Sequence, residues 1–232
     1  MLTRRPAQDR GHANHGWLDS YHSFSFADYF DPLHMGYGPL RVINEDRIEP
    51  GAGFDTHGHR DMEIITIVLA GELEHRDSLG NGSVIRRGEI QRMSAGTGIR
   101  HSEFNPSREQ TTHLLQIWIE PDRASLAPGY EQVPVDLAQS RGRLVQLAGP
   151  APVQTGVSIH QDARLMAGEI DGDESIEYPL PDDRRVYLHL AEGSLTVNGQ
   201  TLSAGDALKI RGEPMVRMSE GRAATVLLFD LP

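Results

Sequence analysis

The sequence contains no cysteine among its 232 residues. This absence excludes a disulfide framework, a thiolate metal site, a cysteine nucleophile and a thiol redox switch. Basic residues are also few: 22 Lys and Arg stand against 33 Asp and Glu, which gives a formal net charge of −11. Because nucleic acids and anionic membranes both require a basic footprint on the protein, this balance argues against direct contact with either.

Long hydrophobic runs are missing as well. The most apolar stretches, residues 64–70 and 223–229, are interrupted by threonine and are far shorter than the roughly 20 residues of a membrane helix. Residues 1–15 carry basic side chains but no apolar segment after them, so no secretory signal is predicted. We therefore expect a cytoplasmic protein that has no membrane partner.

Glycine and proline are plentiful, with 24 Gly and 14 Pro spread along the chain at short intervals. The segments between them are rich in β-branched and aliphatic residues. Leu79–Gly82 and Asn198-Gly199 are typical of tight hairpin turns. Many short strands separated by turns predict an all-β sandwich or barrel with few short helices. Residues 17–29 and 134–140 are the candidates for such helices.

An internal repeat suggests two similar β-domains. Residues 65–93 align with residues 186–210, with Gly71 matching Gly193 and Gly88 matching Gly205. The alternative is that strand-glycine-strand patterns resemble one another in any all-β protein. The boundary is predicted between residues 121 and 134, which divides the chain into residues 1–130 and residues 131–232.

One cluster of residues indicates metal chemistry. His57 and His59 stand two residues apart, and His101 and Glu103 repeat this spacing 42 residues after His59. Residues i and i+2 of a strand share a face, so three imidazoles and one carboxylate converge if the two strands are neighbours. These ligands suit a divalent transition metal such as iron, manganese, copper, nickel or zinc. The site would keep coordination positions open for substrate, unlike a closed structural zinc site. A histidine pair at this spacing can also arise by chance among eleven histidines.

The residues around this cluster strengthen the metal interpretation, because they resemble the two motifs of the cupin superfamily. The first motif is matched by Gly51, His57, His59, Glu63 and Gly71, and the second by Gly88, Ser94, Gly96, His101 and Asn105. Three departures resemble the pirin family specifically: one extra residue before Gly71, serine in place of proline at Ser94, and two extra residues before His101. Residues 10–29 also resemble that family. The specific resemblance covers residues 2–120 and continues more loosely to Pro232.

The resemblance implies a bicupin, in which two antiparallel β-barrels of jelly-roll type pack together. In that family the metal is held by residues that match His57, His59, His101 and Glu103 here. The resemblance also implies an N-terminal metal-binding barrel, and the expected cofactor is one divalent metal, with iron(II) preferred. We expect the chain to be a monomer.

The resemblance is closest to bacterial pirins described as quercetin 2,3-dioxygenases. It therefore implies a metal-dependent dioxygenase that cleaves a flavonol such as quercetin with molecular oxygen. Glu103 would be the catalytic base that accepts the substrate proton. Two alternatives stay open. One is a metal- or redox-sensing regulatory protein that acts through protein-protein contacts, and the other is a cupin enzyme for another metabolite.

Several further residues carry weaker expectations. Glu63 shares strand parity with His57 and His59, so it either orients a ligand or is an ordinary hydrogen-bonding strand residue. His113 alternates with apolar residues and is expected to be a core or pocket histidine instead of a fifth ligand. Four histidines of the N-terminal stretch are expected to be hydrogen-bonding structural residues, with the alternative that one of them lines the pocket: His12, His15, His22 and His34. Three others have no companion at ligand spacing: His75, His160 and His189.

Two sets of residues concern the pocket and the second repeat. The aromatic residues of the N-terminal stretch are expected either in the core or around an apolar pocket: Trp17, Phe24, Phe26 and Tyr29. Counting from the matched glycines places Pro179, Pro181, Met218 and Glu220 at the ligand positions of the second repeat. We therefore expect the C-terminal barrel to lack the metal ligands.

Overall fold

The computed structural model describes the backbone of residues 1–232 and the side chains of all residues except 137 and 138. Nearly all regular structure is β-sheet, as predicted, and the two 3₁₀ turns are Ala7–Asp9 and Leu137–Ser140. The second turn lies in a stretch predicted to be helical. The other candidate stretch, residues 17–29, instead contains strand β3 (Leu18–His22), because Leu18, Ser20 and His22 are buried with a period of two. None of the described helical turns is long and apolar enough to cross a membrane.

The chain divides into two compact units. The N-terminal unit contains Gly11–Val135 and Gly156–Gln161, and the C-terminal unit contains Met1–Arg10, Asp136–Thr155 and Asp162–Pro232. The main boundary lies after Val135, whereas the prediction placed it after residue 130. The units also depart from a linear division in two places, at the N-terminus and at Gly156–Gln161.

Specific contacts explain both differences. At the N-terminus, β1 (Leu2–Arg5) pairs with β19 (Ala207–Arg211). Buried Asp206 accepts hydrogen bonds from Arg4 at 2.6 Å and from the backbone N–H of Ala7 at 2.8 Å. Gly156–Gln161 joins the N-terminal unit because the backbone of Ser158 is held by Arg92 at 2.8 Å and by Glu131 at 3.0 Å.

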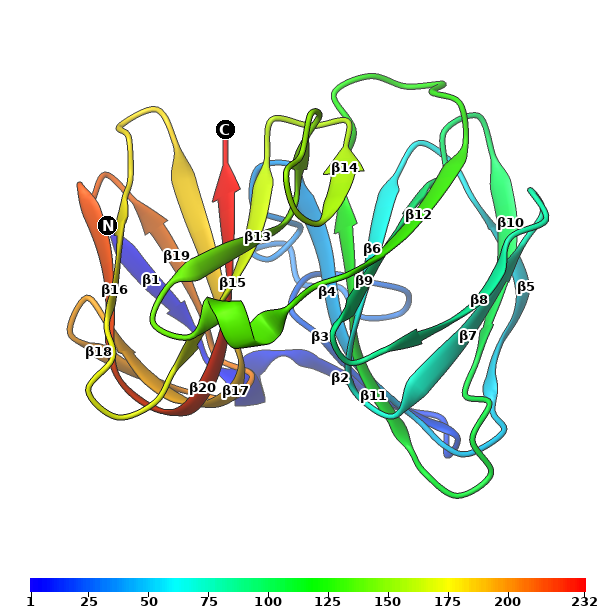
Figure 1. Cartoon of the computed structure of the whole chain (residues 1–232), viewed down its shortest axis with the longest axis horizontal. Coiled ribbons are helices and arrows are strands. Elements are labelled where there is room, and N and C mark those ends of the chain that lie inside the picture. The colour runs from blue at the N-terminus through cyan, green and yellow to red at the C-terminus, as the bar shows by residue number, and fades with distance from the viewer. The chain divides into compact units, whose positions relative to one another are not determined.

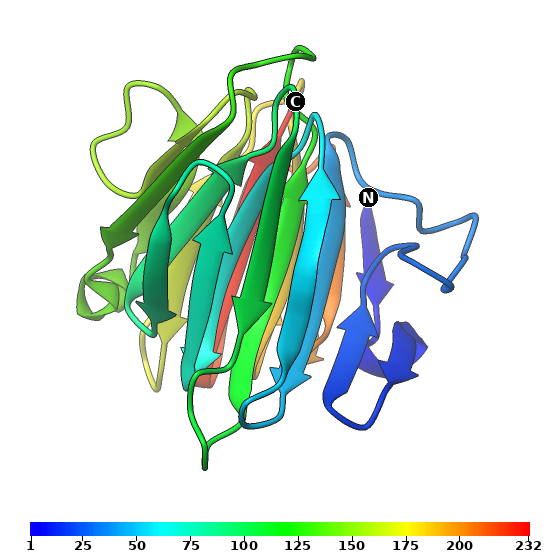
Figure 2. The same ribbon diagram turned by 90° about the vertical axis from the view of Figure 1, so that its right-hand side faces the viewer.

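Two antiparallel sheets form the N-terminal unit, and Figure 1 shows them as separate layers. The larger sheet has the order β12 (Gly129–Pro134), β9 (Glu89–Ser94), β6 (Glu63–Ala70), β11 (Thr112–Ile119), β4 (Leu40–Ile48), β3 and β2 (Gly11–Asn14). The smaller sheet, seen face-on in Figure 2, has the order β5 (Gly53–His59), β10 (Ile99–Phe104), β7 (Glu72–Asp77) and β8 (Gly82–Arg86). The short strand β14 (Val157–Ile159) belongs to the same unit. Neither sheet closes on itself, so the unit is an open form of the predicted barrel.

The C-terminal unit is built around two long, bent strands. Its strands follow the order β1, β19, β17 (Arg185–Val197), β20 (Met215–Leu231), β15 (Arg164–Ile170) and β13 (Leu144–Pro150), with β16 (Ile176–Pro179) on β20 and β18 (Gln200–Ser203) on β17. Because β17 and β20 bend, they pair with different partners at their two ends. A continuous cluster of buried aliphatic side chains fills the interior, among them Leu188, Val226 and Leu228.

The glycines that define the predicted repeat have matching conformations. Gly71 and Gly193 have φ of +75° and +78°, and Gly88 and Gly205 have φ of +87° and +85°. Only glycine adopts this left-handed region readily. At the first pair a side chain would also meet backbone, with Thr111 O 3.0 Å from a Cβ at Gly71 and Ala223 O 2.3 Å from one at Gly193. The equivalence supports the repeat.

Candidate metal centre

The candidate ligands come from two neighbouring strands, as predicted. Strand β5 carries His57 and His59, and β10 pairs with it in antiparallel fashion, so that His101 lies opposite His57. A β-bulge between His101 and Glu103 shifts the register and places Glu103 opposite Phe54. All four side chains therefore come from the edge strand β5 and its neighbour β10 in the four-stranded sheet.

The three imidazoles converge. Ligand atoms of His57, His59 and His101 lie within 4.8 Å of one another, and Nε2 of His59 is 2.9 Å from Nε2 of His101. The Glu103 carboxylate lies within the same distance of His101, in a group with His75. Glu103 is buried, and its Oε2 accepts a hydrogen bond from Gln116 at 2.8 Å. Its Oε1 has no hydrogen-bond partner among the described groups.

Burial sets the protonation of these groups. It lowers the pKa of His59 to about 4 and the pKa of His101 to about 2, and in both cases the nearby His57 contributes. Burial also raises the pKa of Glu103 to about 7, although the hydrogen bond from Gln116 acts in the opposite direction. At neutral pH the two imidazoles therefore keep their lone pairs, and Glu103 can gain or lose a proton easily.

The donor set fits a cation. Two neutral imidazole nitrogens that face each other, with a buried carboxylate oxygen that receives no hydrogen bond, are poorly satisfied by protein groups alone. Imidazole nitrogen and carboxylate oxygen are ligands of divalent transition metals. The residues therefore support a site for a single divalent metal.

His75 belongs to this region, although it has no companion at ligand spacing in the sequence. It lies on β7, the other neighbour of β10, where Asp77 is opposite His101. His75 is fully buried, its Nδ1 is 3.4 Å from Nδ1 of His101, and its Nε2 is 3.3 Å from Oδ2 of Asp77. Spacing along the sequence could not reveal this contact, because His101 lies on a neighbouring strand. The available signal was the alternation of His75 and Asp77 on a strand.

Asp77 can fix the proton positions along this chain of contacts. Although Asp77 is partly buried, hydrogen bonds from Asn81 and from the backbone of Leu79 hold its pKa below the usual range, so it only accepts. His75 then donates from Nε2, and its Nδ1 is an acceptor. Both Nδ1 of His101 at 3.4 Å and Nε2 of Gln91 at 3.3 Å can donate to it. A proton on Nδ1 of His101 leaves a lone pair on Nε2 of His101, the atom that faces His59.

Two other expectations are resolved by hydrogen bonds. Glu63 does not face the histidine cluster: its carboxylate accepts from Ser94 at 2.6 Å and pairs with His160 at 2.8 Å. The parity argument failed because β5 ends at His59, the chain turns at Asp61 with φ of +48°, and β6 belongs to the other sheet. His113 pairs with Glu45 at 2.9 Å, which is consistent with a structural histidine.

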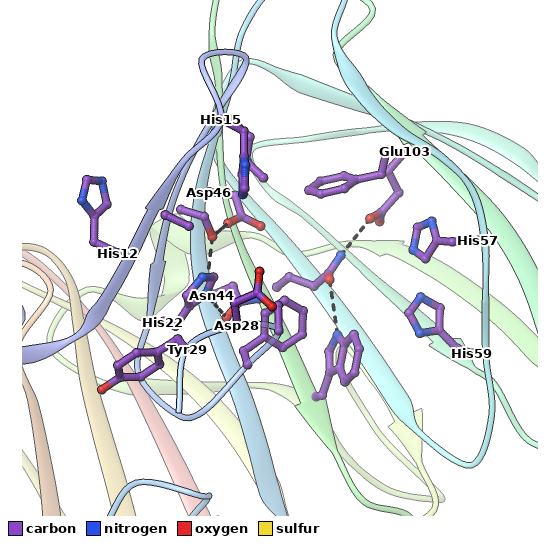
Figure 3. Close-up of a pocket in the computed structure, with 18 residues that line it drawn as sticks. His12, His15, His22, Asp28, Tyr29, Asn44, Asp46, His57, His59 and Glu103 are labelled. Carbon is purple, nitrogen blue, oxygen red and sulfur yellow. Dashed lines mark hydrogen bonds between the residues drawn. The ribbon is translucent and has the colours of Figure 1, made fainter. Parts of the chain in front are cut away.

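A cavity of about 560 Å³ lies between the two sheets and opens onto the candidate ligands. Figure 3 shows His57, His59 and Glu103 on one side and Asn44 and Asp46 on the other. The aromatic part of its lining consists of Phe26, Tyr29, Phe54 and Trp118.

The cavity resolves the expectations for the N-terminal stretch. His12, His15 and His22 also line it. Of these, His12 bonds Asp19 at 2.6 Å and His22 bonds Asn44 at 2.9 Å, and outside the lining His34 bonds Asp31 at 2.8 Å. Of the aromatic residues, Phe26 and Tyr29 reach the cavity, and Phe24 lies in the core. Phe24, Phe26 and Tyr29 follow β3 in a segment without regular strand structure, so strand periodicity could not predict which of them face the cavity.

Comparison with known proteins assigns both halves of the chain. Residues 3–119 match the family described as Pirin, and residues 146–231 match the one described as Quercetinase C-terminal cupin domain. Quercetin 2,3-dioxygenase of Escherichia coli (strain K12) is 47% identical over 232 residues, which cover 100% of this chain and 99% of that protein. The Pirin-like protein of Caulobacter vibrioides is 42% identical over 231 residues, covering 99% of each. The bacterial pirin YhhW of Escherichia coli, solved in complex with nickel(II), superposes with a TM-score of 0.95 at 46% identity, over 100% of this chain and 99% of that one.

Proposed function

The chain belongs to the pirin family, and from this premise we propose that it is a metal-dependent dioxygenase that cleaves a flavonol such as quercetin with molecular oxygen. The observation that carries the proposal is the convergence of His57, His59 and His101, of which His57 and His59 line a cavity with aromatic walls. The name of the Escherichia coli relative supplies the reaction class. A cytoplasmic, monomeric protein stays our expectation.

We propose His57, His59, His101 and Glu103 as the ligands of the metal and iron(II) as the metal that supports the oxygen chemistry. The nickel(II) complex of the Escherichia coli pirin shows that a relative takes up a divalent transition metal. When bound, such an ion would act as a Lewis acid that favours the deprotonated form of a substrate hydroxyl.

Glu103 is the proposed catalytic base. Glu103 would take this role once the substrate oxygen replaces it at the metal. The proton of the substrate hydroxyl would then pass to Oε1 of Glu103, the oxygen that has no hydrogen-bond partner among the described groups. When Glu103 is not bound to the metal, burial raises its pKa to about 7, which suits a group that accepts and returns a proton near neutral pH. Gln116 holds the other oxygen, and Trp118 donates from Nε1 to Oε1 of Gln116 at 3.3 Å. Because the indole N–H can only donate, it orients the amide so that its NH₂ group faces Glu103.

The aromatic lining has a binding role in this proposal. Phe26 and Trp118 contact edge to face with centroids 5.4 Å apart, and Trp118 also packs on His59 at 5.1 Å. Flat aromatic substrates bind well between such side chains. The same side chains would exclude water from the reacting centre.

The test is oxygen uptake by the iron-reconstituted protein with quercetin, compared between the wild type and His59→Ala. We expect uptake in the wild type and its loss in the variant. His113→Gln is the matched control, because His113 lies outside the histidine cluster and should leave uptake intact. No uptake by protein with verified metal content would overturn the proposal. It would favour the regulatory hypothesis, in which the same site senses metal or redox state.

A further inference from the structure

The wall of the cavity opposite the candidate ligands carries a carboxylate that the proposed reaction does not use. Asp46 of β4 lies opposite Ser20 of β3 and is 3% exposed. The Ser20 hydroxyl donates to Oδ1 of Asp46. No described group donates a hydrogen bond to Oδ2. This oxygen can therefore accept a hydrogen bond from a ligand in the cavity (Figure 3).

The neighbours of Asp46 make the wall polar. His22 and Asn44 face each other in the next register position, with Nδ1 of His22 2.9 Å from Oδ1 of Asn44. Gln116 is the register partner of Asn44 on β11 and donates to Glu103. Polar side chains thus continue across three strands towards the candidate ligands.

The charges of the lining indicate which ligands suit the cavity. No lysine or arginine is among the described residues that line it, whereas Asp28, Asp46 and Glu103 are acidic. A ligand that carries phosphate or carboxylate groups would find no cationic side chain on these walls. Burial raises the pKa of Asp46 to about 6, against the effect of the hydrogen bond from Ser20, so the group is largely ionised at neutral pH. An ionised carboxylate is a strong acceptor for a neutral hydroxyl group.

We propose that Asp46 accepts a hydrogen bond from a hydroxyl group at the end of the substrate remote from His57, His59 and Glu103. The cavity would thereby select neutral, polyhydroxylated aromatic compounds over analogues that lack this hydroxyl. This inference rests on the proposed function, which supplies flavonols as the ligands. A site built to bond a hydroxyl discriminates strongly, because an analogue without it leaves a buried carboxylate unpaired.

The experiment compares the binding of quercetin with that of 3-hydroxyflavone, which lacks the hydroxyls of both benzenoid rings. Kd is measured on anaerobic, metal-loaded protein through quenching of tryptophan fluorescence, since Trp118 lines the cavity. We expect the wild type to bind quercetin about tenfold or more tightly than 3-hydroxyflavone. Asp46→Asn should bring this ratio close to one by weakening quercetin alone.

Two further variants separate hydrogen bonding from folding and charge. Ser20→Ala removes the protein's own donor to Asp46 and should keep or increase the ratio. Glu109→Gln removes a negative charge from an exposed position of the same unit outside the cavity lining and should preserve the ratio. Thermal unfolding of each variant reports whether the fold is retained.

The outcomes distinguish this subsite from the proposed function. Selective binding that depends on Asp46 but is not followed by oxygen uptake supports the subsite and contradicts the dioxygenase. Oxygen uptake with a ratio unaffected by Asp46→Asn overturns the subsite alone. The subsite is also overturned if Asp46→Asn and Ser20→Ala each weaken the binding of quercetin and of 3-hydroxyflavone equally. The hydrogen bond between Ser20 and Asp46 would then only stabilise the structure. Failure of the wild type to bind either flavonol overturns both proposals.

Discussion

The two units share a strand plan but use the same row of positions differently. In the N-terminal unit, His101 lies between His57 on one neighbouring strand and Asp77 on the other. In the C-terminal unit, Met218 lies between Ile176 and Val197, and all three are buried in the apolar cluster.

The same arrangement of strands can therefore hold either polar, ionisable side chains or apolar side chains at these positions. A row of aliphatic and thioether side chains gains stability by leaving water. The histidine and carboxylate row forgoes this gain and must be satisfied by hydrogen bonds or by a metal ion. One unit is therefore suited to packing, and the other to binding.

The largest expected effect comes from replacing His101 of the N-terminal unit by methionine, the residue that Met218 places at the matching position of the C-terminal unit. His101→Met removes a central member of the proposed ligand set and should weaken metal binding by more than about 100-fold, beyond the loss typical of partners behind the ligands. Affinity for nickel(II) is measured by competition with a chelator. His113→Gln serves as the control, and binding within tenfold of the wild type would show that His101 is not a ligand.

The reverse exchange tests the C-terminal unit. Met218→His buries an imidazole among aliphatic side chains without a partner and should lower the free energy of unfolding by about 1–3 kcal/mol. Urea unfolding gives this value. Arg217→His, one residue earlier on the exposed face of β20, should change it by less than about 0.5 kcal/mol. If the two variants lowered the free energy of unfolding equally, the buried position would accept a polar side chain as readily as the exposed one.

A third exchange concerns the outer member of the row, Asp77. In Asp77→Asn the amide NH₂ can donate to Nε2 of His75, which reverses the proton positions and leaves a hydrogen on Nε2 of His101. We expect metal affinity to fall about tenfold, the lower end of the range for partners behind metal ligands. Nitrogen NMR shifts of the imidazoles in the metal-free protein report the reversal directly.

The control for Asp77 is its partner in the turn. Asn81→Ala removes a hydrogen bond of 2.9 Å to the Asp77 carboxylate but leaves the carboxylate as an acceptor. It should lower stability without changing the His101 tautomer. If Asp77→Asn and Asn81→Ala weakened metal binding equally, Asp77 would act only by stabilising the turn.

These residues also show what a sequence can predict. Strand parity predicted that each ligand pair shares a face, because it depends only on neighbours along one strand. The same reasoning failed for Glu63, where a turn at Asp61 separates two strands of different sheets. His75 and Asp46 depend on register between strands distant in the sequence, which periodicity does not contain. Counting between glycines located Met218 correctly but reached Pro179 where the register shows Ile176, because the segments before the two rows differ in length.

The smallest expected effect is the pH dependence of metal binding. Between pH 6 and pH 8, His59 and His101 stay neutral, because burial lowers their pKa values to about 4 and about 2. Glu103 has a pKa of about 7, so its ionised fraction rises about tenfold over this range. Since the metal binds the ionised form, nickel(II) affinity should rise about tenfold with pH and level off above pH 8.

Calorimetry in two buffers should accordingly show about one proton released on binding at pH 6 and almost none at pH 8. Gln116→Leu removes the hydrogen bond that lowers the pKa of Glu103, so the midpoint should move to higher pH. Glu220, the position that counting aligns with Glu103, is exposed on the other unit, and Glu220→Gln should leave the profile unchanged. Release of more than one proton at pH 6 would mean that imidazoles are protonated in the metal-free protein. The row of the N-terminal unit would then differ from that of the C-terminal unit in charge as well as in polarity.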